Sequence, residues 1–160
     1  IKDTVHTLSK ESQNKDYTEV YQERLKDIDF SSLIFDKDSL VSRLPKVLPC
    51  TAYHGDLTLE NILYNVEQGE FVLIDPLTTE YDSYVFDLAK LRQDIECKWF
   101  IRQDQIYIDT KLKSLSEELE LEFEHYSNPY TLILMLLRVL PYTQESDQQY
   151  IINEANKLWK

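Results

Sequence analysis

The amino-acid sequence predicts a mainly α-helical domain with one small antiparallel β-hairpin, which is an α+β fold. Its 160 residues, 42% of them hydrophobic, suffice for one compact domain with its own core. Only 2 Gly and 5 Pro are present, which favours helices over a sheet with many turns. Apolar residues recur at helical spacing in most segments, whereas β-prone runs occur mainly in one closely spaced pair. We therefore expect residues 1–160 to fold as a single, mostly helical domain.

Before residue 54, the sequence predicts two helices and a short strand. Apolar residues spaced three and four apart indicate an amphipathic first helix: Tyr17, Val20, Tyr21, Leu25 and Ile28. Asp36 or Asp38 can cap a second helix, which ends near Pro45. Residues 50–53 are expected to form a short strand that leads into a polar loop at residues 54–60.

The predicted hairpin follows this loop. Residues 62–64 and 71–74 are β-prone apolar runs, and Gly69 between them can adopt a positive φ angle in the turn. Pro76 ends the second strand because proline has no N–H to donate to a ladder.

The second half of the chain predicts four further helices. The first covers residues 81–99, and the third contains residues 130–140, which are apolar nearly all round and predict burial on every side. Three of the helices have residues suited to their first turn: Ser114 with Glu117, Asn128 with Pro129, and Ser146 or Asp147.

The formal net charge of -12 argues against some classes of partner. An acidic surface repels polyanions, so we expect neither nucleic acid nor an anionic membrane as a partner. The longest apolar run, residues 132–137, is far shorter than the roughly 20 residues that a membrane-spanning helix needs. Cys50 and Cys97 form neither a zinc-like spacing nor a disulfide framework, so a reducing cytoplasm is the expected location.

Three polar side chains in residues 53–76 suit phosphoryl transfer: Asp56, Asn61 and Asp75. The reaction needs a carboxylate that orients the acceptor hydroxyl, and oxygen ligands that hold Mg²⁺ on the nucleotide phosphates. If the hairpin loop spans residues 66–70, the antiparallel register sets Asn61 opposite Asp75, with Cβ atoms about 5 Å apart. The two side chains would then converge on one metal, and Asp56 would reach it from the preceding loop.

These residues also carry a family resemblance. The pattern H-G-D-x-x-x-x-N at residues 54–61, an Ile-Asp pair after the hairpin and F-D-L-A at residues 86–89 resemble motifs of the aminoglycoside phosphotransferase and choline kinase superfamily. The resemblance implies a protein-kinase-like fold, of which this chain would be the C-terminal lobe. It also implies Mg²⁺-assisted transfer of phosphate from ATP or GTP to a hydroxyl of a small molecule, such as an aminoglycoside, an amino alcohol or a sugar.

Carried over residue by residue, the resemblance makes Asp56 the catalytic residue and makes Asn61 and Asp75 the magnesium ligands. His54 and Asp87 would support the catalytic loop. The sequence departs from the family at residues 82–84, where Asp-Ser-Tyr replaces the common Gly-Asp-Pro, and at the position after the metal aspartate, where proline replaces an aromatic residue. These departures leave the catalytic and metal positions intact but do not indicate which acceptor is used.

The nucleotide-clamping lobe of such a kinase has no counterpart in the sequence. That lobe supplies a glycine-rich loop and a lysine paired with a glutamate. Gly55 and Gly69 are isolated, so no phosphate-cradling loop can be identified. We therefore expect the N-terminal lobe to be missing, residues 1–12 to continue a longer upstream segment, and the isolated chain to show little turnover.

Other interpretations of the pattern exist. A degenerate kinase-like module could bind a ligand or partner without catalysis. A metal-dependent hydrolase could use His54 and Asp56 as ligands, but further partners at ligand spacing are not evident. Tyr107, Trp99 and Trp159 could line a substrate pocket, although aromatic residues at helical spacing are more often part of a core.

Overall fold

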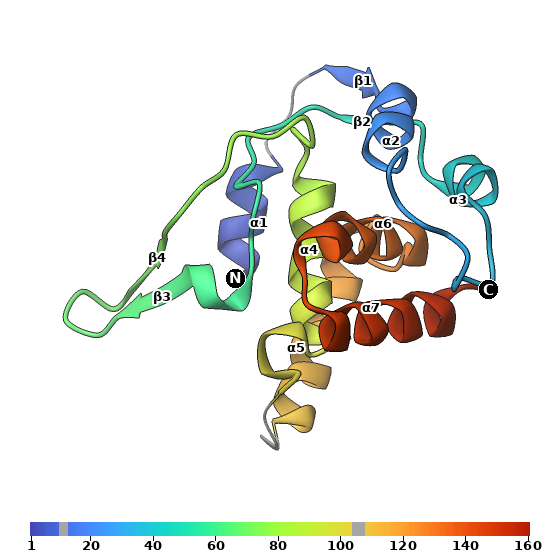
Figure 1. Ribbon diagram of the computed structural model, residues 1–160. Helices are drawn as coiled ribbons and strands as arrows, with labels where there is room; N and C mark the ends of the chain where they lie inside the picture. The colour runs from blue at the N-terminus through green and yellow to red at the C-terminus, as the bar shows by residue number, and fades with distance from the viewer. Residues whose placement is uncertain (10–12, 104–107) are drawn as a thin grey trace. The chain divides into compact units, whose positions relative to one another are not determined.

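A computed structural model of the protein describes residues 1–9, 13–103 and 108–160. Within these residues, the chain is mainly helical, with seven α-helices and two two-stranded β-sheets (Figure 1). This agrees with the predicted α+β class. The chain forms two compact units, which are described separately below: Ile1–Gln13 with Pro49–Ser127, and Asn14–Leu48 with Asn128–Lys160.

The first unit is built around one buried helix. Its elements are α1 Lys2–Leu8, η1 Leu59–Asn61, β3 Ile62–Asn65, β4 Glu70–Leu73, α4 Tyr84–Ile95, η2 Trp99–Ile101 and α5 Asp109–Glu122. Residues 85–95 of α4 are all buried, and α1 and α5 both contact this helix. The side chain of Ser83 caps α4 by accepting a hydrogen bond from the N–H of Val85.

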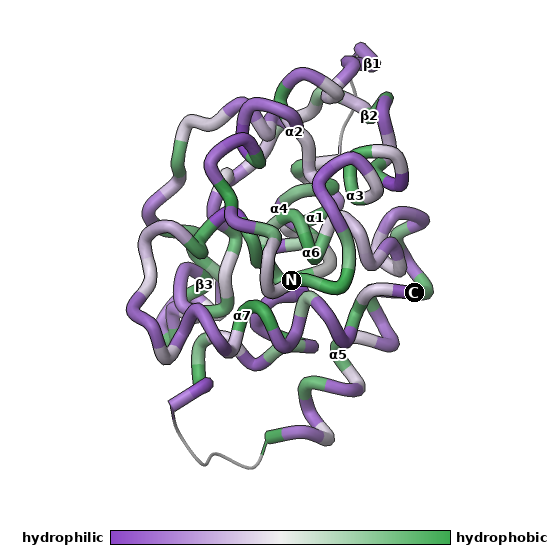
Figure 2. Tube along the Cα trace, turned by 45° about the vertical axis from the view of Figure 1, so that its right-hand side comes forward, coloured by the Kyte–Doolittle hydropathy of each residue, from purple (hydrophilic) through white to green (hydrophobic). Residues whose placement is uncertain are grey.

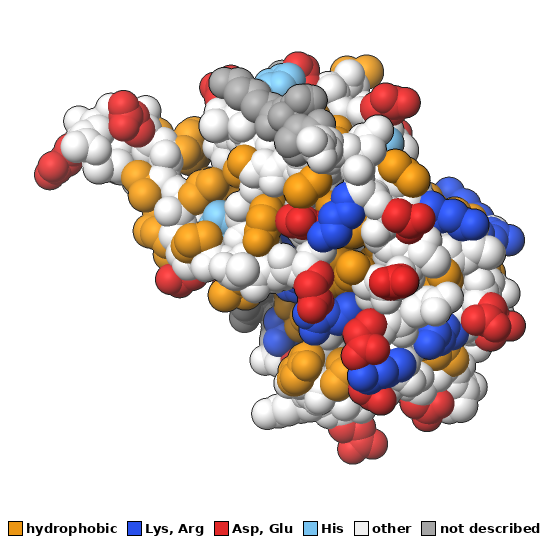
Figure 3. Space-filling model, turned by 90° about the horizontal axis from the view of Figure 1, so that it is seen from above, with side chains coloured by type: hydrophobic (Ala, Val, Ile, Leu, Met, Phe, Trp, Pro, Cys, Tyr) orange, Lys and Arg blue, Asp and Glu red, His pale blue; other side chains and the backbone are white. Residues whose placement is uncertain are grey.

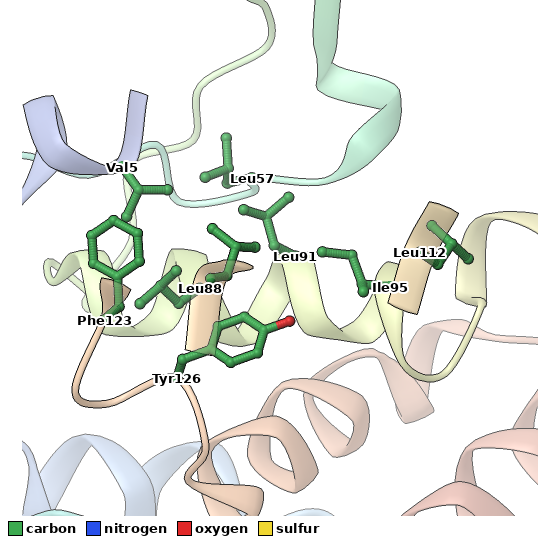
Figure 4. Packing of buried hydrophobic residues seen from close by; sticks show 9 residues of the cluster. Val5, Leu57, Leu88, Leu91, Ile95, Leu112, Phe123 and Tyr126 are labelled. Carbon is green, nitrogen blue, oxygen red and sulfur yellow. The ribbon is translucent and has the colours of Figure 1, made fainter. Parts of the chain in front are cut away.

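An apolar core surrounds one face of α4 (Figure 4). Leu88 and Leu91 of α4 pack with Val5 from α1 and with Phe123, which follows α5. Leu57 joins them from the loop that precedes η1, and its side chain is fully buried. The core therefore fixes the polar loop that contains Asp56 against the central helix.

The β3–β4 hairpin is far less covered. Leu63, Tyr64, Phe71 and Val72 have between 43% and 57% of their surface exposed. In Figure 3, the hairpin is the arm at the left, and hydrophobic side chains lie along it. The hairpin is thus held mainly by its own ladder and by the segments at its base.

The second unit is also mostly helical. It contains α2 Thr18–Arg24, α3 Lys37–Arg43, α6 Pro129–Val139, η3 Leu140–Tyr142 and α7 Glu145–Leu158, and β1 Asn14–Asp16 pairs with β2 Val47–Pro49. As predicted, Asn128 caps α6, and residues 131–137 are all buried. Helix α7 is mostly hydrophilic, with hydrophobic residues recurring along it (Figure 2), and it contacts α6.

Several predicted boundaries were wrong. The strand expected at residues 50–53 ends at Pro49, because the segment that pairs with β1 is β2 Val47–Pro49. The first predicted helix is shorter than its apolar pattern, since α2 ends at Arg24. Neither α1 nor β1 was expected from the sequence.

Two predicted helix starts were also wrong. Ser114 and Glu117 lie inside α5, which starts earlier because burial of Leu112 in the core extends the helix toward its N-terminus. The last helix begins at Glu145, before the two residues that were expected to cap it. In the part of the chain that the structure describes, no helix is long and apolar enough to cross a membrane.

Candidate active site

Helix α4 holds the loop at residues 54–59 through polar side chains spaced three and four residues apart. Asp87 accepts hydrogen bonds from the N–H groups of His54 (2.6 Å) and Gly55 (2.9 Å). One turn further, Lys90 Nζ lies 3.0 Å from Asp56 Oδ1. Asp94 then accepts a hydrogen bond from the Leu59 N–H at 2.8 Å. The i, i+3, i+7 spacing places all three side chains on one face of the helix, under the loop.

Gly55 lets a second segment approach this loop closely. Its φ angle is +81°, and a Cβ atom built there would lie 2.1 Å from the backbone oxygen of Leu77. Both the backbone conformation and the lack of space exclude a side chain at this position. The residues after β4 therefore lie directly against the loop.

His54 joins the same two segments. Its ring Nε2 donates a hydrogen bond to the backbone oxygen of Ile74 at 2.9 Å, because a carbonyl oxygen can only accept. Its own backbone oxygen accepts a hydrogen bond from the Leu77 N–H at 2.8 Å. Asp75 lies between these two attachment points, so both neighbouring segments hold it in place. Its side chain is exposed, and its backbone has a φ angle of +54°.

The Asn61 side chain is hydrogen-bonded to the loop that contains Asp56. The amide Nδ2 donates a hydrogen bond to the backbone oxygen of Asp56 at 2.8 Å. This contact assigns the nitrogen, and it leaves the amide oxygen Oδ1 available as a ligand. Among the described residues, neither Asn61 Oδ1 nor the Asp75 carboxylate has a hydrogen-bond or ion-pair partner.

The predicted pairing of Asn61 with Asp75 across the hairpin is wrong by one residue. Asn65 pairs with Glu70 and Ile62 with Leu73, so continuing the ladder sets Asn61 opposite Ile74. Indeed, the Ile74 N–H donates to the Asn61 backbone oxygen at 3.1 Å. A slip of one residue moves a side chain to the other face of an extended ribbon.

The cause of this error is the turn. The Gly69 N–H donates to the Asn65 backbone oxygen, and the Asn65 side chain accepts hydrogen bonds from the N–H groups of Glu67 and Gln68. These bonds close a loop of residues 66–69, one residue shorter than assumed. Asp75 is consequently brought toward the loop by the His54 contacts and not by a direct cross-strand pair.

Burial raises the pKa of two carboxyl groups beneath the loop, those of Asp87 and Asp94. Desolvation raises the pKa of Asp87 to about 6, although hydrogen bonds from the N–H groups of His54, Gly55 and Leu57 act to lower it. Desolvation likewise raises the pKa of Asp94 to about 6, against attraction from Lys90. The Asp56 side chain is 28% exposed, whereas that of Lys90 is only 6% exposed. The Asp56 side chain is therefore more accessible to solvent than that of Lys90.

The oxygen donors of Asn61 and Asp75 are too few to form a complete metal cage by themselves. Within residues 1–9, 13–103 and 108–160, no group of three or more His, Cys, Asp or Glu side chains could hold a metal ion. Asn61 Oδ1 and the Asp75 carboxylate offer three oxygen atoms from two side chains. Mg²⁺ commonly binds one or two carboxylates and takes its other ligands from water and nucleotide phosphates, so the residues present fit this cation.

Sequence reasoning missed Lys90 and Asp94. Both are polar residues at helical spacing from Asp87, in a helix whose other residues are mostly apolar, and this pattern is visible in the sequence. The partners of these side chains could not be deduced from it, because they depend on how the loop packs over α4.

The two described aromatic residues that were considered for a substrate pocket belong to different units. Trp159 lines a pocket of about 670 Å³ in the second unit, together with Phe35 and Arg43. Trp99 belongs to η2 in the first unit, where the Arg102 guanidinium lies 3.9 Å from its ring centroid. Tyr107 lies outside the described residues.

Comparisons with known proteins do not assign the chain to a family: no family model, no curated protein and no solved structure matches it. The function must therefore be argued from the site itself.

Proposed function

We propose that the chain is the substrate-side lobe of a kinase-like phosphotransferase that moves the γ-phosphate of ATP or GTP to a hydroxyl of a small molecule. An aminoglycoside, an amino alcohol or a sugar would be the acceptor. One observation carries the proposal. The loop with Asp56 and Asn61 and the segment with Asp75 are joined through His54, which bonds to Ile74 and Leu77 on either side of Asp75.

In this proposal, each residue has a role that matches its environment. Asp56, partly exposed at the loop surface, orients the acceptor hydroxyl and receives its proton. Asn61 Oδ1 and the Asp75 carboxylate would hold Mg²⁺, which neutralises charge on the transferred phosphate when it is bound. His54 and Asp87 keep the two segments together. Phosphoryl transfer depends chiefly on such positioning and on charge neutralisation.

The nucleotide clamp belongs to residues outside this sequence in our proposal. Both glycines are used for close backbone geometry: Gly55 at the contact with Leu77, and Gly69 in the hairpin turn. Neither belongs to a glycine-rich phosphate loop. The isolated chain should accordingly transfer little or no phosphate, and robust ATP-dependent turnover by these 160 residues alone would contradict this part of the proposal.

A second candidate is a non-catalytic kinase-like module that binds a ligand or a partner. The ion pair between Asp56 and the buried Lys90 favours it, because a carboxylate held by a buried cation can serve structure alone. The exposure of Asp56 supports the catalytic alternative. Substitution of the carboxylate distinguishes the two.

The test is transfer of labelled γ-phosphate from ATP by the intact protein over a panel of small alcohols, comparing wild type with Asp56→Ala. Loss of a general base should lower kcat by about 10²-fold or more in a protein that still folds, although loss of the ion pair with buried Lys90 should lower its melting temperature. Substituting the exposed Val66 with Ala provides a control, since this residue lies in the hairpin turn at 81% exposure. A folded Asp56→Ala protein that keeps full activity would disprove the role of Asp56 in transfer.

A further inference from the structure

Lys90 of α4 is a buried lysine that forms an ion pair with a partly exposed carboxylate. Its side chain is only 6% exposed, yet its ammonium group lies 3.0 Å from Asp56 Oδ1 on the overlying loop. A buried lysine carries a large desolvation cost, which a partner must offset. The partner here is the carboxylate that a substrate could reach from solvent.

The surroundings of this ion pair are acidic. Asp94 lies one turn from Lys90 on the same helix and is attracted by it, while Asp56 and Glu60 repel Asp94. Asp94 in turn binds the Leu59 N–H, so its position is fixed by the loop. Lys90 thus supplies positive charge among three carboxylates.

Contacts within the loop hold the backbone of Asp56 in place. Leu57, the residue after Asp56, is fully buried in the core, and the Asp56 backbone oxygen accepts a hydrogen bond from the Asn61 side chain. With its backbone held on both sides, Asp56 has mainly the rotation of its short side chain left. A contact at Oδ1 restricts that rotation.

We propose that Lys90 is a positioning residue for Asp56: its ammonium group binds Oδ1 from below and fixes the carboxylate in the orientation that faces the acceptor hydroxyl. This inference rests on the proposed phosphotransferase function. Lys90 does not touch substrate and acts only through Asp56. A misplacement of a catalytic group by about 1 Å can cost roughly 10²-fold in rate, so the contribution should be measurable.

The first readout is kinetic and uses the intact protein with an acceptor that it phosphorylates. Lys90→Met, which keeps the side-chain length but removes the charge, should lower kcat by about 10- to 100-fold and leave the KM for ATP within about 3-fold. Lys90→Arg should recover part of that loss. Lys98→Met is the matched control, because it removes the exposed ion pair with Asp109 and should leave kcat unchanged.

The second readout needs no substrate and no Lys90 substitution. The ammonium group of a buried, ion-paired lysine exchanges slowly with water, so its ¹⁵N–¹H signal should be visible by NMR near neutral pH. Asp56→Asn should shift or abolish that signal, and Lys98→Met should leave it in place. This measurement decides whether the pair exists even if Lys90→Met does not fold.

The outcomes separate the two proposals. If Asp56→Asn is inactive but Lys90→Met keeps wild-type kcat, Lys90 has no positioning role and the phosphotransferase proposal stands. If Asp56→Asn phosphorylates the acceptor as fast as wild type, the catalytic role of Asp56 is wrong, and the positioning role of Lys90 is wrong with it. If wild type transfers phosphate to no acceptor, the proposed function itself is wrong. An ammonium signal that Asp56→Asn leaves unchanged would overturn the inference whatever the kinetics, whereas loss of the signal together with a selective fall in kcat would support it.

Discussion

Asp87 illustrates at the residue scale how one buried side chain can organise a loop. Its carboxylate accepts hydrogen bonds from two consecutive backbone N–H groups, those of His54 and Gly55. Backbone N–H groups at the start of a tight loop would otherwise lack partners, which is costly in a buried place. The opposing cost is desolvation of the carboxylate, which raises its pKa to about 6.

The raised pKa of Asp87 makes stability depend on pH. Since the folded pKa, about 6, lies above the ordinary value of 3.8, the folded state binds the proton more tightly than the unfolded state. The contribution of Asp87 to the free energy of unfolding is therefore greatest near pH 4 and declines as the pH rises to about 6, by roughly 3 kcal/mol at most. Urea unfolding of wild type and Asp87→Asn at several pH values should show the advantage of wild type shrinking over this window. An advantage that grows with pH would contradict the assignment.

At the scale of elements, the site depends on two short segments packed against each other and not on the hairpin ladder. Residues 54–58 contact residues 74–77 through His54 and through the close approach at Gly55. The ladder of β3 and β4 ends one residue out of the expected register. The hairpin therefore brings Asp75 near residues 54–55, while the loop contacts determine where it lies.

Substituting the two glycines with alanine should separate this packing from simple backbone strain. Gly55→Ala places a methyl group 2.1 Å from the Leu77 backbone oxygen, whereas Gly69→Ala has nothing closer than the Tyr64 hydroxyl oxygen at 3.9 Å. Both residues have positive φ, so both substitutions cost about 1 kcal/mol in backbone strain. Gly55→Ala should cost at least about 2 kcal/mol more, because backbone atoms must move. Equal losses of unfolding free energy in chemical denaturation would contradict the close contact.

Considered as a whole molecule, the chain places the proposed catalytic, metal-binding and supporting residues in one of its two compact units. Residues 53–87, which contain the loop, the hairpin and the start of α4, all belong to the unit Ile1–Gln13 with Pro49–Ser127. The second unit contributes a buried helix, α6, and a separate aromatic pocket. The geometry of the proposed site can thus be studied through the first unit's own contacts.

The sequence predicted the parts of this molecule that depend on local chemistry. The helical class, the hairpin, and the caps at Asp36 and Asn128 follow from spacing and from side-chain hydrogen bonds to nearby N–H groups. The register of the hairpin was missed because it depends on the hydrogen bonds that Asn65 makes within the turn. The Lys90–Asp56 pair was missed because residues 34 positions apart meet only after the loop packs on α4. The sequence did not predict contacts of this kind, which form only when distant segments pack together.

The most direct test of the account asks whether the two segments form one metal–nucleotide site. Mn²⁺ with ATP should be added to the isotopically labelled intact protein, since this paramagnetic ion replaces Mg²⁺ at oxygen ligands and broadens nearby NMR signals. If Asn61 and Asp75 hold one metal ion, their backbone amides should broaden selectively, and the effect should be lost in Asp75→Ala. Broadening elsewhere with both amides unchanged would contradict the account.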